Sequence, residues 1–298
     1  MTSDRPVVGE AAVEQLLELL DLRRLDDTTF LGTSPPVGPL RVYGGQVAGQ
    51  ALVAAGRTVD PSRHVHSLHG YFVRPGDPTA PIEYQVENIR DGRSFSVRRS
   101  VAVQHGKTIF FMSASFQHPE EGLDHQTPLP PDVPGPDEVP TMTERLARYP
   151  ERLGIWGEIP RPIDVRYVGE PGWVRPGDRP AEPHQRVWMR IDAKLPDDPL
   201  LHACALTYAS DLTLLDAVLS THGEVWGPAA SPAPASTTPC GSTGPSAPTN
   251  GSSTTAPARP RPAAADSPPA GCSAPTAGTS PAPYRRGWSA VSRDDHRK

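Results

Sequence analysis

Residues 228–298 contain no Leu, Ile, Phe or Met, and their only Val is Val291. Pro, Ala, Ser, Thr and Gly make up most of this stretch. A segment of this composition cannot bury enough apolar surface to offset the entropy that ordering it would cost. We therefore expect a disordered tail over residues 227–298, so a folded core has to be built from the residues before it.

Charge and cysteine content exclude several classes of protein. A formal net charge of −5 gives no basic field for nucleic acid or an anionic membrane. No apolar run approaches the roughly 18 residues of a membrane span, and residues 1–15 lack the pattern of a signal peptide. The three Cys residues lie far apart, which fits neither a disulfide framework nor a zinc site. We expect a reduced, cytoplasmic protein with no nucleic-acid partner, no membrane span and no metal site.

Residues 201–215, LHACALTYASDLTLL, form a helix pattern that ends at an acid. Leu201, Cys204, Ala205 and Tyr208 fall at i, i+3, i+4 and i+7, which is one apolar face of a helix. Asp211 then interrupts the apolar pattern, and a carboxylate is costly to bury unless it is hydrogen-bonded or functional. Two interpretations remain open at this point: Asp211 caps the helix, or it takes part in chemistry.

A small-residue helix and a series of strand patterns precede this segment. Gly44 and Gly45 open a helix over residues 44–55, whose small side chains suit a helix enclosed by a sheet, and residues 11–22 form a shorter amphipathic helix. Asp91-Gly92 and His105-Gly106-Lys107 are turn signals between strands. The expected strands are residues 29–31, 65–73, 82–86, 95–103 and 109–116. One helix with a consecutive antiparallel meander predicts an α+β fold.

A Pro-rich stretch divides the chain. It includes PLPPDVPGPDEVP, which favours an extended conformation and cannot pair in a sheet. Beyond it, residues 163–168 and 186–191 are strand-like, and Asp197-Asp198-Pro199 supplies an N-cap for the helix that follows. The expected organisation is a complete unit at residues 1–118, a linker at 119–159, a second and partial unit at 160–226, and the tail at 227–298.

Five motifs together resemble type II acyl-CoA thioesterases, a family built from two fused hotdog folds. The motifs are GGQVAGQALVAA (residues 44–55), HSLHGYFVRPGD (66–77), IRDGRSFSVRR (89–99), FFMSASFQ (110–117) and YASDLTLL (208–215). They occur in family order between about residues 13 and 226. The resemblance implies a double hotdog whose second half is incomplete, an acyl-CoA substrate and no cofactor. It also implies a homo-oligomer if the second hotdog is intact.

The resemblance also assigns residues to a site. Asp211 corresponds to one of three family residues that hold and polarise the attacking water. Its partners, a Ser or Thr and a Gln, would fall where Pro234-Ala235 and Tyr284-Arg285 stand, so neither is encoded at its expected position. The substrate-binding candidates are Gly45, Gln46, His69, Arg93, Ser94 and Phe95.

Each candidate for substrate binding also has a simpler interpretation. Gly45 and Gln46 begin a helix whose N–H groups could polarise a thioester carbonyl, although close packing also explains the glycine. His69, with His66, could ligate a metal or be satisfied within a strand. Arg93 and its two neighbours could line a substrate channel or form a solvated strand edge. Arg98-Arg99 could meet CoA phosphates or form a surface pair.

The tail admits a sharper interpretation. Residues 236–241 (STTPCG) can be encoded so that a frame one base earlier reads Leu-Asp-His-Ala-Met-Trp. Residues 284–288 (YRRGW) shifted in the same way read Val-Gln-Glu-Gly-Leu. Both resemble family motifs in family order, so we interpret the tail as a frameshift product. The alternative is a genuine disordered tail on a non-catalytic, acyl-CoA-binding hotdog protein.

Under the frameshift interpretation, the chain as written is predicted to be poorly folded in its second half and nearly inactive. The helix after Leu200 would lack most of the sheet that should enclose it. We expect Leu201, Ala205, Tyr208 and Leu212 to face water. A hotdog enoyl-CoA hydratase is a further alternative, but His202 precedes Asp211 by too many residues to form the acid and histidine pair it would need.

Overall fold

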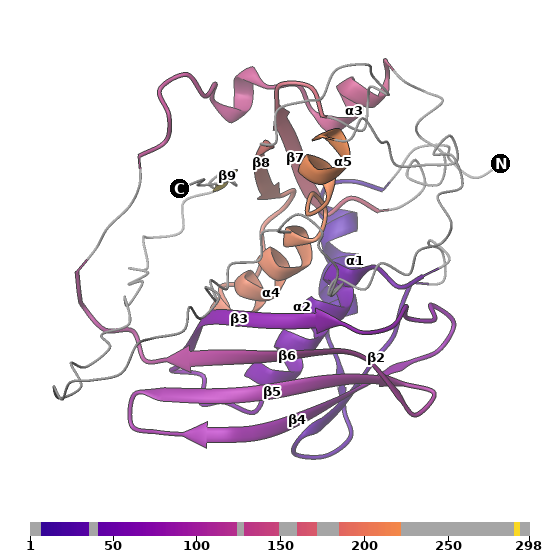
Figure 1. The fold of residues 1–298 in the computed structure, drawn as a ribbon, viewed down its shortest axis with the longest axis vertical. Coiled ribbons are helices and arrows are strands. Elements are labelled where there is room, and N and C mark those ends of the chain that lie inside the picture. The colour runs from indigo at the N-terminus through magenta and orange to yellow at the C-terminus, as the bar shows by residue number, and fades with distance from the viewer. Residues whose placement is uncertain are drawn as a thin grey trace, which may run out of the picture.

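The computed structural model describes residues 7–35, 41–123, 128–148, 160–171, 185–221 and 289–292. Its elements in order are α1 (Glu10–Leu20), β1 (Arg23–Arg24), β2 (Thr29–Gly32), α2 (Gly44–Gly56), β3 (His64–Phe72), β4 (Ile82–Asp91), β5 (Phe95–Gln104), β6 (Lys107–Gln117), the 3-10 helix η1 (Pro136–Glu138), α3 (Met142–Leu146), β7 (Ile163–Val168), β8 (Arg186–Ile191), α4 (Pro199–Ser210), α5 (Asp216–Thr221) and β9 (Ser289–Ser292). They form a larger unit around a six-stranded sheet and a smaller unit around a three-stranded sheet (Figure 1).

The larger sheet has the antiparallel strand order β1-β2-β4-β5-β6-β3. The turn between β5 and β6 has positive φ at His105 (48°) and Gly106 (70°), as a tight hairpin with the right-handed twist requires. The expectation that all strands follow one another is wrong for β3, which lies beyond β6 and not beside β4. Residues 73–81 join β3 to β4 without a tight hairpin turn, so these two strands are free to lie apart.

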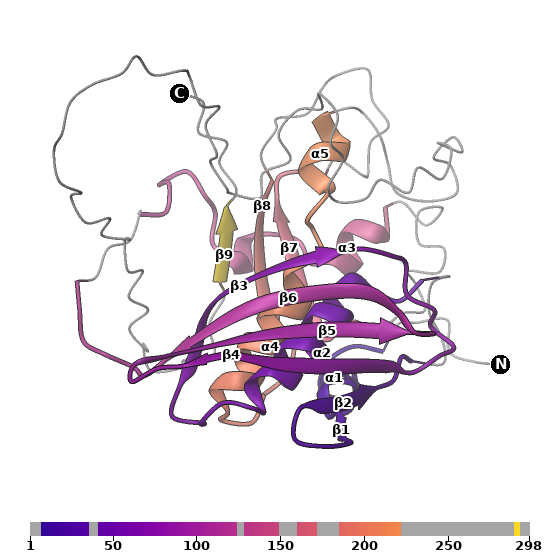
Figure 2. The same ribbon diagram turned by 60° about the horizontal axis from the view of Figure 1, so that its bottom comes forward.

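Helix α2 lies against one face of this sheet (Figure 2), as the small-residue pattern predicts. Its polar Gln50 is fully buried, and its side chain accepts a hydrogen bond from the Tyr84 hydroxyl (2.7 Å) and donates to the Leu19 carbonyl (2.7 Å). The remaining contacts around α2 are apolar, with Phe30, Leu52, Ile82, Met112 and Phe116 among the fully buried side chains. The core of the molecule therefore lies between α2 and the sheet.

A second helix, α4, packs along α2 on a row of glycines. A Cβ atom at Gly45 would lie 2.3 Å from the Tyr208 carbonyl oxygen, and at Gly49 it would lie 3.3 Å from the Cys204 carbonyl oxygen. A Cβ at Gly56 would lie 2.4 Å from a methyl carbon of Leu200. The glycines of α2 thus serve close contact between two helices, where the sequence suggested contact between a helix and a sheet.

This packing corrects the expectation that α4 exposes its apolar face. Ala205 is 1% exposed, and Leu201 and Tyr208 are half-buried, whereas Leu212 is 36% exposed as expected. Leu206 is 57% exposed. The prediction is wrong for three of the four residues because α2 packs closely along α4 and covers part of its surface.

The smaller unit contains β7, β8 and a strand from the tail. β9 (Ser289–Ser292) pairs antiparallel with β8, from Arg186 opposite Ser292 to Met189 opposite Ser289. The expectation of a wholly unstructured tail is therefore wrong at these four residues, because the open backbone edge of β8 can pair with any extended segment. Residues 227–288 and 293–298, to which the expectation of disorder also applies, lie outside the described residues.

Part of the expected linker belongs to this smaller unit. The Trp188 indole donates to the Pro134 carbonyl (2.9 Å) and the Arg166 guanidinium donates to the Pro136 carbonyl (2.8 Å). α3 is capped by Thr141, whose side chain accepts from the Glu144 amide. Residues 134–148 of the expected linker at 119–159 therefore bond to β7 and β8. No helix in the described ranges has the length and apolar character that crossing a membrane requires.

Candidate active site

The C-terminus of α4 meets the N-terminus of α2 at Asp211. Asp211 is the C-cap of α4, and its carboxylate oxygen Oδ2 accepts a hydrogen bond from the Gly45 backbone N–H at 2.9 Å. A negative charge at a helix N-terminus is stabilised by the helix dipole and by the N–H groups that have no partner within the helix. Asp211 thus ends one helix, as the capping interpretation expects, and presents a half-buried carboxylate at the start of another. Its part in chemistry stays a prediction.

Gly44 makes room for this carboxylate, and Gly45 makes room for the end of α4 beside it. A Cβ atom at Gly44 would lie 2.6 Å from Asp211 Oδ2, and one at Gly45 would meet the Tyr208 carbonyl oxygen. Neither distance is compatible with any side chain larger than hydrogen. Gly44 is absent from the set of site residues expected from sequence, although it is the first residue of the same Gly-Gly pair.

Two tyrosines fix the end of α4 beside the carboxylate. The Tyr43 hydroxyl donates to the Tyr208 carbonyl at 2.7 Å, and the two rings pack edge to face with centroids 4.9 Å apart. Burial, followed by the negative charge of Asp211, raises the pKa of Tyr43 far above its ordinary value, and burial raises the pKa of Tyr208 to about 12. Both hydroxyls therefore stay protonated near neutral pH. Tyr43 has no sequence signal beyond its position next to the Gly-Gly pair.

The side chain of Gln46 points away from this carboxylate. Its amide donates to the Thr33 carbonyl (3.2 Å) and the Ser34 hydroxyl (3.0 Å), and the residue is 3% exposed. The side chain thus connects α2 to the residues after β2. Only the main chain of Gln46 lies at the start of α2 near Asp211.

His69 lies on the exposed face of the edge strand β3. Its ring packs against Tyr71 with centroids 4.7 Å apart. Its neighbour His66 shares a hydrogen bond of 2.8 Å with the Ser115 hydroxyl. Among the described residues, no group of three or more His, Cys, Asp or Glu side chains could hold a metal ion.

Arg93, Ser94 and Phe95 lie at the other end of α2 from Asp211. They form the turn between β4 and β5, next to Thr58 and the C-terminal end of α2. The thirteen residues of α2 span about 20 Å at about 1.5 Å per residue. The structure therefore brings Asp211 and Gly45 together and places these three residues far from them, in an open hollow of about 430 Å³.

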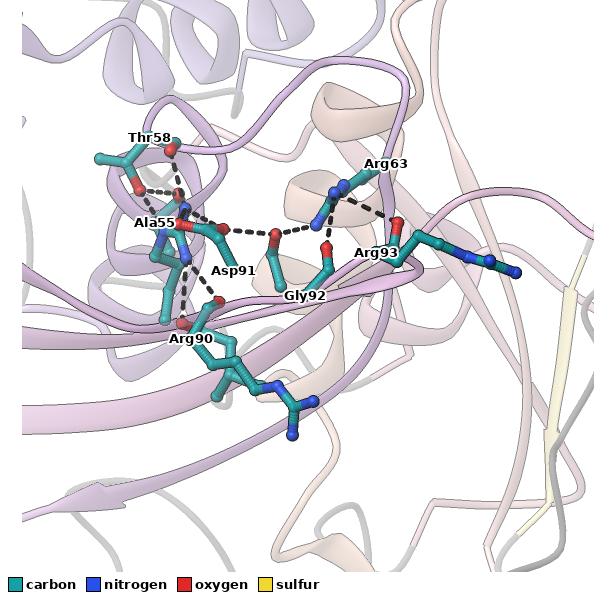
Figure 3. Close-up of polar contacts among 10 residues, drawn as sticks. Ala55, Thr58, Arg63, Arg90, Asp91, Gly92 and Arg93 are labelled. Carbon is teal, nitrogen blue, oxygen red and sulfur yellow. Dashed lines mark hydrogen bonds and ion pairs between the residues drawn. The ribbon is translucent and has the colours of Figure 1, made fainter.

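Arg98 and Arg99, the two arginines beside this turn, have different surroundings. Arg98 is 2% exposed and donates to the Thr58 carbonyl (3.0 Å), the Thr58 hydroxyl (2.9 Å) and the Asp91 carboxylate (2.8 Å), as Figure 3 shows for the network. Arg99 is exposed, with its guanidinium over the Phe111 ring at 5.4 Å. Arg98 is thus neither a phosphate ligand nor a surface residue, because its donors are used inside the protein.

Two residues considered for other chemistries have structural roles. Cys204 is fully buried, and burial raises the pKa of its thiol well above the ordinary value, so it remains a neutral core side chain. His202 lies in the first turn of α4, where its ring nitrogen is 2.9 Å from the Pro196 carbonyl oxygen. The length of α4 separates His202 from Asp211, so the two do not form the pair that a hydratase would need.

Comparison with known proteins identifies relatives of both units. The family model of the acyl-CoA thioesterase N-terminal domain matches residues 32–117, and that of acyl-CoA thioesterase matches residues 162–230. Human acyl-coenzyme A thioesterase 8 is 40% identical over 216 residues, which covers 68% of this chain and 67% of the relative. Acyl-CoA thioesterase 2 of Haemophilus influenzae is 38% identical and covers 70% of this chain and 74% of the relative.

Solved structures agree with these relatives. The acyl-CoA thioesterase II TesB2 of Mycobacterium marinum is 42% identical, with a TM-score of 0.54 over 71% of each chain. A tesB protein of Mycobacterium avium subspecies paratuberculosis is 30% identical, with a TM-score of 0.57 over 72% of this chain and 76% of that one. A protein from Alicyclobacillus acidocaldarius with a hot dog fold has a TM-score of 0.52 at 24% identity, covering 70% of this chain and 72% of that one.

These matches confirm the hotdog fold and the resemblance carried by the five motifs. The identity of 40% extends over two thirds of a relative, and the two family models cover both units of the chain in order. The chain belongs to the acyl-CoA thioesterase family of thioester hydrolases.

Proposed function

We propose that the carboxylate of Asp211 orients the water that hydrolyses an acyl-CoA thioester at the junction of α4 and α2. The observation that carries this proposal is the hydrogen bond from the Gly45 N–H to Asp211 Oδ2 at 2.9 Å. It holds an acid in a fixed position at a helix N-terminus, in a half-buried site between two helices.

Hydrolysis of a thioester by water can be catalysed by one oriented carboxylate, assisted by neighbouring polar groups. Water attacks the thioester carbonyl carbon, the carbon–sulfur bond breaks, the acyl group leaves as a carboxylic acid, and the CoA sulfur takes up a proton. A thioester is activated and its thiolate is a good leaving group, so the step needs an oriented water and no covalent nucleophile. Asp211 would hold that water and accept its proton as the carbonyl is attacked.

The two partners that the family resemblance expects for Asp211 are missing from the chain as written. The positions where they would fall, Pro234-Ala235 and Tyr284-Arg285, are themselves no Ser, Thr or Gln, and both lie outside the described residues. We therefore propose that this chain has little activity and that a frame restored after about residue 226 would recover it. The nucleotide sequence from Gly223 onward tests the frameshift directly.

A thiol-release assay with acyl-CoA tests the catalytic role. The repaired chain should release CoA, the chain as written should stay near background, and Asp211→Asn in the repaired chain should lower kcat by about 10²-fold or more. Asp197→Asn is the matched control, because Asp197 is an exposed acid just before the other end of α4. An Asp211→Asn enzyme that turns over as fast as its repaired parent would exclude Asp211 as the water-holding residue.

The missing partners also favour a second candidate function, a non-catalytic protein that binds acyl-CoA. It requires the sequence of the tail to be genuine. In that case the chain as written binds a non-hydrolysable acyl-CoA thioether, and Asp211→Asn changes its affinity without any hydrolysis to lose.

A further inference from the structure

An open hollow lies away from Asp211, at the turn between β4 and β5. Arg90, Arg93, Ser94, Phe95, Val97 and Ser115 line it together with Gly92. Its volume of about 430 Å³ is within the range of about 300–1,000 Å³ typical of small-molecule sites. Ser96 and Arg98, which alternate with Phe95 and Val97 along β5, are buried. The hollow therefore opens on the face of the sheet that is turned away from α2.

The rim of this hollow is positively charged in a chain of negative net charge. Arg90 and Arg93 are exposed and make no ion pair with any described residue. The acid nearest to them in sequence, Asp91, is paired with Arg98 at 2.8 Å. No acidic side chain lines the hollow. Two guanidinium groups without an acidic partner favour an anionic ligand, and their planar geometry matches phosphate oxygens.

The lining of the hollow includes an aromatic surface. Phe95 is 42% exposed and lies edge to face with the His66 ring, with centroids 5.8 Å apart. His66 is held by its hydrogen bond of 2.8 Å to the Ser115 hydroxyl. An exposed ring that a neighbour holds in place can stack on a planar base, which is a common way for proteins to bind nucleotides.

A hydrogen-bonded network holds the turn that carries these groups. Ser96 donates to Asp91 (2.6 Å), and the Arg63 guanidinium donates to the Gly92 carbonyl (2.9 Å). Figure 3 shows that Arg63 points into this network, whereas the side chains of Arg90 and Arg93 point away from it. The backbone of the turn is thus organised before any ligand binds, which lowers the entropic cost of binding.

We propose that this hollow binds a phosphorylated nucleoside, with Arg90 and Arg93 on the phosphate and Phe95 against the base. Two sources share this chemistry: the nucleotide end of a CoA thioester, or a free nucleotide. The assignment to CoA rests on the proposed function. A single CoA thioester bound at both sites would have to be extended, because α2 alone separates its two ends by about 20 Å.

Calorimetric titration of the full-length chain tests the proposal with defined probes. These are adenosine 3′,5′-bisphosphate, AMP, inorganic phosphate, CoA and phosphopantetheine, which lacks the nucleoside. Arg90→Ala and Arg93→Ala should each weaken nucleotide binding by about 10-fold or more, since each removes a charged hydrogen bond. Phe95→Ala should weaken the nucleotides and leave phosphate binding unchanged. The matched control is Arg99→Ala, which removes an exposed arginine outside the hollow and should bind like the parent.

The probes distinguish the two sources. CoA and adenosine 3′,5′-bisphosphate binding alike, with phosphopantetheine silent, identifies the nucleotide end of CoA. AMP binding more tightly than CoA identifies a free nucleotide. Arg90→Lys and Arg93→Lys are controls for misfolding of the alanine variants. They keep the positive charge, so they should lose less affinity than the alanine variants.

Equal binding by the parent, Arg90→Ala and Arg93→Ala would overturn the proposal, as would inorganic phosphate binding as tightly as any nucleotide. Binding by the repaired chain that persists without thioester hydrolysis would count against the thioesterase mechanism and in favour of this hollow as a separate nucleotide site. Normal hydrolysis by Arg90→Ala and Arg93→Ala, together with unchanged CoA affinity, would support the thioesterase mechanism and would count against nucleotide binding in this hollow.

Discussion

At the scale of single residues, Asp211 joins two parts of the chain that lie far apart in sequence. Its carboxylate interrupts the apolar pattern of one helix and accepts a hydrogen bond of 2.9 Å from the Gly45 amide at the start of another. Tyr43 and Gly44 were not expected in the site, because an aromatic residue and a glycine before a helix are equally typical of packing. Their roles depend on the position of α4, which is more than 150 residues away in sequence and is set by tertiary contacts.

The burial of Arg98 also could not be predicted from the sequence pattern. Its alternation with apolar residues on β5 suggested a surface position, whereas it is buried by a network that joins β5 to the residues after α2. A sequence does not reveal that Thr58 and Asp91 converge on one guanidinium. Hydrogen bonds from Ser96 and then from Arg98 lower the pKa of Asp91 below its ordinary value of 3.8.

The lowered pKa of Asp91 predicts a pH-dependent contribution to stability. A carboxyl whose folded pKa is depressed stabilises the fold above its unfolded pKa, near 3.9, and loses this contribution as pH falls through the folded pKa. Asp91→Asn should therefore destabilise the protein at pH 6, and the difference from the parent should shrink toward pH 3. Urea unfolding at both pH values measures it, with the exposed Asp197→Asn as control. A difference that stays constant with pH would exclude a charged role for Asp91.

At the scale of elements, the sequence predicted most helices and strands but not how they meet. The expected helix at residues 44–55 is α2 (Gly44–Gly56), and the expected strand at 65–73 is β3 (His64–Phe72). Local periodicity sets such elements, whereas the place of β3 beyond β6 is set by long-range pairing. The glycine row of α2 was equally compatible with packing on a sheet, so the contact with α4 did not follow from the pattern.

The glycine row predicts graded effects of adding one methyl group. Gly45→Ala would bring a Cβ to 2.3 Å from a main-chain oxygen that side-chain rotation cannot move, so α2 and α4 must separate, at a cost of about 1–3 kcal/mol or more. Gly49→Ala meets the Cys204 carbonyl at 3.3 Å, and the higher helix propensity of Ala, about 1 kcal/mol, should offset the strain. Gly122→Ala has no atom within 4 Å and is the control. Urea midpoints that are equal for Gly45→Ala and the parent would contradict the close packing.

At the scale of the whole molecule, the family and the two-unit plan could be predicted from five ordered motifs. The relation of the units could not, because the linker motif suggested a boundary that the structure does not respect. The second unit contributes α4 to the first, and residues 134–148 attach to β7 and β8. The core thus includes side chains from both sides of the Pro-rich stretch, as in Cys204 and Ala205 packed among residues of α2.

This shared core determines where limited proteolysis should stop. If the units were independent, digestion would leave a fragment that ends near residue 118. Removing α4 would instead expose the glycine row and take Leu200, Ala205 and Tyr208 away from the core around α2, and each large side chain so lost forfeits about 1.5–3 kcal/mol. A domain has only about 5–15 kcal/mol of stability in total, so native protein should retain α4 while it remains folded. We expect the lightly digested chain to keep residues up to about 221, either intact or as fragments that stay associated, as native mass spectrometry would show. In Gly45→Ala the contact between α2 and α4 is weakened, and the product should shift toward residue 118. A parent that trims directly to residue 118 would show that α4 contributes nothing to the stability of the first unit.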